Sequence, residues 1–180
     1  MPLDWNVVVS VRERGFAMAF DILREYGAVA RTGYYNVLVM KVVSPAGLLA
    51  KLEKRLQVNS DLMTYISRIA PAAETFDFAT PQEFEERARE AVTRFVPQLA
   101  GKSFHVRMHR RGSKRELSSI VVERYLSQYV LGALNEAGTS GTICFNDPDA
   151  VIDLETVDHR AGLSLWTRDD VQRYPFLKPE

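Results

Sequence analysis

The chain has 180 residues, of which 46% are hydrophobic and 26% are charged, and this balance predicts a folded globular protein rather than a disordered one. Its 23 basic and 23 acidic side chains cancel to a net charge of zero, which excludes a general polycation, so any contact with nucleic acid requires a local basic patch. A single cysteine, Cys144, excludes an internal disulfide framework and a zinc site built from several thiolates. The sequence has neither an apolar run of roughly 18 residues nor a secretory signal, and we therefore expect a cytoplasmic protein.

The first 79 residues predict a small sheet with two helices. The expected elements are strands at 5–11, 28–32 and 36–43, a helix from Phe16 that stops at Gly27, a helix that opens at Ser44-Pro45, and an extended segment at 65–78. Pro71 would confine that last segment to an edge or a bulge. This β-α-β-β-α-β order is the split unit that folds as an antiparallel sheet with both helices on one side. No catalytic signature occurs here, and four arginines would extend a cationic surface: Arg12, Arg14, Arg24 and Arg31.

The second half opens with a strong helix start, which places the predicted domain boundary between residues 79 and 80. Thr80-Pro81-Gln82-Glu83 combines a capping threonine, a proline at the first helical position and a glutamate that can close a capping box. The elements expected after it are a helix that ends at Gly101, a strand at 104–109, a helix from Ile120 to about Ala137, and strands at 142–145, 151–157 and 163–167, with turns at 146–149 and 158–162.

The stretch Lys102–Arg124 carries most of the chemistry that the sequence offers. It holds seven cations and two carboxylates in a chain whose net charge is zero. Over Phe104–His109 apolar and polar residues alternate, which predicts a strand with one face toward a core and the other toward water or an anion. Ser118 and Ser119 are candidate N-caps of the next helix, and arginines just before a helix N-terminus favour a phosphate site. The alternative is a solvated loop between a strand and a helix.

Acidic residues gather between 147 and 158, but their pattern favours structural roles over a metal or nuclease site. Asp147 and Asp149 stand in a turn that favours aspartate for backbone reasons, while Asp153 and Glu155 alternate along a strand, where we expect them to be solvated. The three histidines match no ligand spacing with Cys144. We therefore predict no metal site, no cofactor and no catalytic residue. Three aromatic residues near the end of the chain are expected to seal the core: Trp166, Tyr174 and Phe176.

With these elements in place, the second half resembles a THUMP domain, the RNA-binding module of tRNA-modifying enzymes and of the adaptor of the tRNA cytidine acetyltransferase. The resemblance is carried by FHVRMHRRGSKRELSS at 104–119, the helix VVERYLSQYV that follows, TICFNDPDAVIDLE at 142–155, and the closing GLSLWTRDDVQRYPF. Asp147 departs from the family pattern, in which asparagine is commoner at this position of the turn. The first half is similar to the ferredoxin-like domain that usually precedes THUMP, so the resemblance covers most of the chain.

The resemblance implies an α+β protein in which an N-terminal ferredoxin-like βαββαβ domain, residues 1–79, precedes an α/β THUMP domain, residues 80–180. Proteins of this kind grip the acceptor end of tRNA, including its 3′ terminus. The match places Arg107, Arg110, Arg111 and Lys114 on the RNA backbone, where the planar fork of arginine suits phosphate. The full set of candidate RNA-binding residues is Lys102, His105, Arg107, His109, Arg110, Arg111, Lys114 and Arg115.

We therefore expect a non-catalytic protein that presents tRNA to a separate modification enzyme such as an acetyltransferase. Replacing Arg110 and Arg111 with alanine is expected to weaken tRNA binding without unfolding the protein. Two alternatives stay open: the N-terminal RNA-binding part of a longer tRNA-modifying enzyme, and a ferredoxin-like small-molecule sensor. Binding to tRNA that weakens steeply with salt separates the first two from the sensor.

Overall fold

The computed structural model describes residues 4–179, which divide into two compact units. The first unit runs to Ala73 and also includes Arg173–Lys178, whereas the second holds Glu74–Gln172. The division falls ahead of the predicted boundary between residues 79 and 80. The reason is that the predicted extended segment 65–78 is two strands, and each of them belongs to a different sheet.

The first unit is built on a four-stranded antiparallel sheet in the order β2-β3-β1-β4. Its elements are β1 (Val7–Val11), α1 (Phe16–Leu23), β2 (Ala28–Arg31), β3 (Val37–Lys41), α2 (Pro45–Val58), α3 (Asp61–Tyr65) and β4 (Ile66–Pro71). This is the predicted order of strands and helices with the short helix α3 added. Pro71 ends the strand at one end of the sheet order, where its missing N–H interrupts no ladder.

The end of the chain returns to the first unit and lies along β4. The backbone N–H of Ile69 donates to the carbonyl oxygen of Phe176 at 2.8 Å, and Arg68 Nε donates to the carbonyl oxygen of Lys178 at 2.9 Å. Tyr174 and Phe176 are buried, in agreement with the prediction that they seal a core. Residues 173–178 therefore group with the first unit, whereas the sequence predicts a second domain over residues 80–180.

The second unit is built on a five-stranded mixed sheet in the order β5-β9-β8-β6-β7. Its elements are β5 (Glu74–Asp77), α4 (Pro81–Thr93), the 3-10 turn η1 (Val96–Leu99), β6 (Ser103–Arg111), α5 (Ser119–Glu136), β7 (Thr142–Ile143), β8 (Ala150–Val157), β9 (Arg160–Thr167) and α6 (Arg168–Arg173). β6 runs parallel to both β7 and β8, and the other pairs are antiparallel. The predicted turn at 158–162 is shorter, because Val157 already pairs with Arg160. None of the described helices combines the length and the apolarity of a membrane span.

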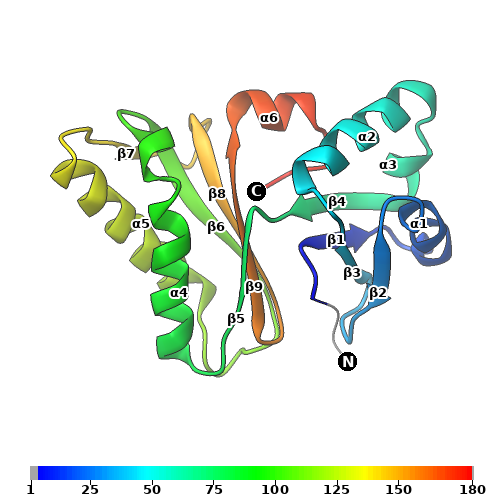
Figure 1. The fold of residues 1–180 in the computed structure, drawn as a ribbon, viewed down its shortest axis with the longest axis horizontal. Coiled ribbons are helices and arrows are strands. Elements are labelled where there is room, and N and C mark those ends of the chain that lie inside the picture. The colour runs from blue at the N-terminus through cyan, green and yellow to red at the C-terminus, as the bar shows by residue number, and fades with distance from the viewer. Residues whose placement is uncertain (1–3, 180) are drawn as a thin grey trace. The chain divides into compact units, whose positions relative to one another are not determined.

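Helices α4 and α5 lie side by side over one face of this sheet (Figure 1). Phe84 from α4, Phe104 from β6 and Leu126 from α5 are fully buried in the core between them. The alternation along β6 is the predicted one, since Phe104, Val106 and Met108 all enter this core. The polar residues His105, Arg107 and His109 alternate with these core positions.

Helix α4 begins with the predicted threonine cap, but Glu83 accepts from the residue before the cap and not from Thr80 itself, as a capping box requires. Thr80 Oγ1 accepts a hydrogen bond from the N–H of Glu83 at 3.1 Å, and Glu83 Oε2 accepts one from the N–H of Ala79 at 2.9 Å. We expect Thr80→Ala to lower the free energy of unfolding by about 1 kcal/mol, because one helix N–H loses its acceptor. Urea denaturation measures this, with Thr80→Ser as the control that keeps the oxygen. Equal stability of the alanine variant and the wild type would show that the Thr80 cap does not stabilise the fold.

Candidate nucleic-acid interface

Strand β6 and its flanking loops carry all eight predicted RNA-binding residues. Lys102 precedes the strand, and Lys114 and Arg115 follow it in the loop that leads to α5. Arg110 differs from His105, Arg107 and His109 because along β6 it continues the series of Phe104, Val106 and Met108. Its Nη1 donates to the carbonyl oxygen of Gly112 at 3.1 Å. His105 Nδ1 lies 3.0 Å from the carbonyl oxygen of Cys144.

Four of these cations are open to solvent. They are Lys102, Arg107, Lys114 and Arg115. Exposed lysine and arginine side chains attract a polyanion more strongly than buried cations that a carboxylate already neutralises. These four side chains are therefore the best placed of the predicted set to contact an RNA backbone.

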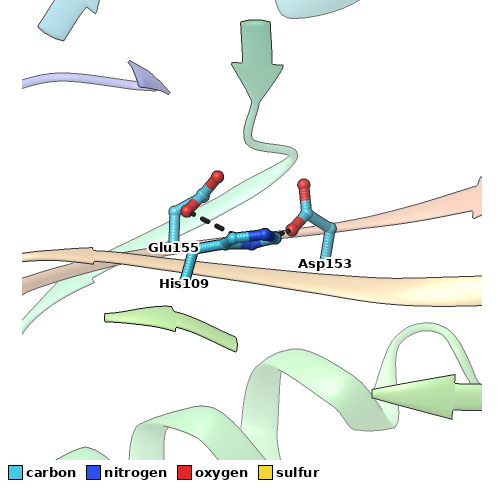
Figure 2. Close-up of side chains that lie close together, drawn as sticks. All are labelled: His109, Asp153 and Glu155. Carbon is cyan, nitrogen blue, oxygen red and sulfur yellow. Dashed lines mark ion pairs between the residues drawn. The ribbon is translucent and has the colours of Figure 1, made fainter. Parts of the chain in front are cut away.

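The prediction that Asp153 and Glu155 are solvated is wrong, because each is only 2% exposed. The parallel pairing of β6 with β8 sets Glu155 opposite His109, so the carboxylates lie beside the polar residues of β6. Figure 2 shows the His109 ring between the two acids. His109 Nδ1 is 3.4 Å from Asp153 Oδ1 and 3.8 Å from Glu155 Oε2. Arg111 Nη1 donates to Glu155 Oε2 at 3.0 Å.

One histidine and two carboxylates with ligand atoms within 4.8 Å of one another form a set that divalent metals accept. Arg111, however, already places a positive charge beside Glu155 and opposes the entry of a second cation. We interpret the four side chains as a buried polar network, in which the ion pair between Arg111 and Glu155 ties β6 to β8. His109 and Arg111 are thus largely buried beside carboxylates, whereas the sequence predicts that this face is open to water or an anion.

The network changes the expected effect of removing Arg111. Its side chain is only 14% exposed, and its loss leaves the buried Glu155 carboxylate without this partner. We expect Arg111→Ala to lower the free energy of unfolding by about 3–5 kcal/mol, contrary to the prediction of an unaltered fold. Arg107→Ala, four positions away and exposed, should change it by less than about 0.5 kcal/mol. Equal urea midpoints for both variants would contradict a stabilising network.

A second tie fixes the first residue of β6. The Asp149 carboxylate accepts hydrogen bonds from the N–H and the hydroxyl of Ser103, at 2.9 and 3.1 Å. These bonds favour the ionised form and lower the pKa of Asp149. Asp149 thus has the structural role that the turn pattern predicts, and it anchors the strand that carries the cations.

A groove that the sequence did not predict lies beside β6. The groove has a volume of about 340 Å³, and we call it the α5–β6 groove. Its lining residues are Val106, Arg107, Ile120, Glu123, Arg124, Ser127, Gln128, Ile143 and Phe145. The signal was present in the helix, since positions 120, 123, 124, 127 and 128 recur at helical spacing and form a stripe separate from the core stripe.

Glu123 lies inside this groove among cations. Partial burial disfavours its charged form and raises the pKa of Glu123, while the positive charge of Arg107, followed by His105 and His109, acts in the opposite direction. Burial is the larger effect. The carboxyl group is thus the acidic feature of a groove whose other lining residues are apolar, cationic or neutral polar.

Part of this sequence is similar to known proteins. No protein-family model matches the sequence. The chain is 33% identical to the tRNA sulfurtransferase of Salmonella typhimurium over 133 residues, which cover 68% of this chain and 26% of that enzyme. It is 32% identical to the tRNA sulfurtransferase of Shigella sonnei over the same length. The chain thus spans about a quarter of the length of the curated relatives it matches.

Solved structures share the fold. The protein PH1313 from Pyrococcus horikoshii superimposes with a TM-score of 0.62 at 15% identity, over 89% of this chain and 54% of the other. A 4-thiouridine synthetase solved in complex with RNA and ATP superimposes with a TM-score of 0.57 at 14% identity, over 89% of this chain and 40% of the other. These superpositions show a shared fold, and the relatives found by sequence are tRNA sulfurtransferases.

Proposed function

We propose that this chain binds tRNA, gripping its acceptor end, and holds it for chemistry that other residues perform. The observation that carries the proposal is the 33% identity to an enzyme named for its action on tRNA. The exposed cations along β6 supply a physical means of binding, because guanidinium and ammonium groups contact phosphates without reading sequence. The sheet order β2-β3-β1-β4 supports a ferredoxin-like first domain within the same proposal.

Two forms of this function fit about equally well. In the first, the chain is a non-catalytic adaptor that presents tRNA to a separate modification enzyme, such as an acetyltransferase. In the second, it is the RNA-binding part of a longer tRNA-modifying enzyme, which agrees with a match that spans 26% of the sulfurtransferases. Both forms require the same contact with tRNA, and the same measurements test that contact.

Fluorescence anisotropy with whole tRNA tests the binding itself. We expect the logarithm of the affinity to fall linearly with the logarithm of the salt concentration, because bound phosphates release counterions. Removing the 3′ single strand from the tRNA should weaken binding about tenfold if the acceptor end is gripped. Equal affinity for both RNAs would contradict that mode, and an absence of tRNA binding at low salt would remove the proposal as a whole.

The cations of β6 and its following loop are tested by a charge-matched pair of variants. Arg107→Ala combined with Arg115→Ala should weaken tRNA binding about tenfold or more and lower the salt slope by about two, because two phosphate contacts are lost. The control combines Lys51→Ala with Lys54→Ala, two exposed cations of α2. A loss of affinity that is equal in the two double variants would mean that net charge, rather than β6, governs binding.

A further inference from the structure

The α5–β6 groove exists because one edge of β6 is mostly uncovered. The neighbouring strand β7 pairs only with Ser103 and Phe104, so the rest of this edge has no strand partner among the described residues. The second stripe of α5 faces this edge and forms the opposite wall. The volume of about 340 Å³ lies within the size range of small-ligand pockets and accommodates one planar ring system.

The groove carries an exposed apolar surface. Phe145 is 77% exposed and Ile120 is 68% exposed, although both are large hydrophobic residues. The ring of Phe145 packs against the ring of His105, with a distance of 5.5 Å between the centroids and an interplanar angle of 38°. His105 is itself positioned 3.0 Å from the carbonyl oxygen of Cys144. An aromatic ring that is fixed on one side and open on the other is a platform on which a base can stack.

The polar groups of the groove indicate what kind of ring it takes. Arg107 and Arg124 line it, and both side chains are exposed. They suit phosphates on either side of a stacked base. Glu123 adds a carboxylate, which accepts hydrogen bonds from amino groups and would be unfavourable next to a phosphate. This combination fits a nucleotide better than it fits an inorganic anion or an apolar peptide.

We propose that the α5–β6 groove binds one unstacked nucleobase that carries an exocyclic amino group, taken from a single-stranded part of the RNA. Phe145 and Ile120 contact the ring, and Glu123 accepts a hydrogen bond from the amino group. Arg107 and Arg124 contact the neighbouring phosphates. Adenine, cytosine and guanine have such a group and uracil lacks it, so the groove disfavours uracil. This inference rests on the proposed function and adds a base preference to it.

Short labelled single-stranded oligomers of adenylate, cytidylate and uridylate, titrated against the full chain by fluorescence anisotropy, test the preference. We expect the adenylate and cytidylate oligomers to bind about fivefold or more tightly than the uridylate oligomer. Glu123→Gln should bring the three affinities together, because an amide both donates and accepts. Equal affinities in the wild type, or an unaltered preference in the variant, would overturn the role of Glu123.

Phe145→Ala tests the stacking with whole tRNA as the probe. Loss of the ring should weaken tRNA binding about tenfold, whereas Val121→Ala, an exposed apolar change on α5 outside the groove, should leave it unchanged. Circular dichroism checks that both variants remain folded. If the wild type binds tRNA with a steep salt dependence while Phe145→Ala binds equally well, the groove proposal fails and the proposed function stands. If the wild type does not bind tRNA, both fail.

Discussion

The parallel pairing of β6 with β8 is the constraint on which the candidate interface depends. This register places the buried carboxylates of Asp153 and Glu155 beside His109 and Arg111, and an ion pair in such a position resists separation because each charge would otherwise be buried alone. The same strand is left open on its other side, since β7 covers only its first two residues. One edge of β6 is thus fixed by charge pairs while the other is available to a ligand.

This division separates cations that look alike in the sequence. Arg107 and Arg111 are four residues apart on one strand, yet Arg111 is held by a carboxylate and Arg107 lines an open groove. The structural role of Arg111 and the proposed binding role of Arg107 are distinguished by their neighbours rather than by their chemistry. The flanking cations of the loops, Lys102, Lys114 and Arg115, extend the exposed positive surface along the chain.

The elements of the second unit were largely predictable because their patterns are local. The alternation over Phe104–His109 and the N-cap at Thr80 each require only a few neighbouring residues, and both occur as predicted. The burial of Asp153 and Glu155 was not predictable from β8 alone, because it depends on which strand lies beside it. The return of residues 173–178 to the first unit has the same origin, since it is a contact between distant parts of the chain.

The groove was accessible to sequence reasoning only in part. The stripe that begins at Ile120 has helical spacing, but the sequence does not reveal that β7 ends at Ile143 and leaves Phe145 exposed. Strand length at a sheet edge is decided by competing contacts, and the pattern at 142–145 predicts a longer strand than the two residues that form. An open strand edge and an exposed aromatic ring therefore come from the structure alone.

Hydroxyl-radical footprinting of the full chain, with and without saturating tRNA, tests most directly whether RNA docks at the open edge of β6. Phe145 and Tyr35 are each 77% exposed, so both should be oxidised readily in the free protein. We expect tRNA to lower the oxidation of Phe145 and Ile120 strongly and to leave the oxidation of Tyr35, in the first unit, unchanged. Oxidation of Phe145 that persists unaltered while tRNA is bound would contradict it.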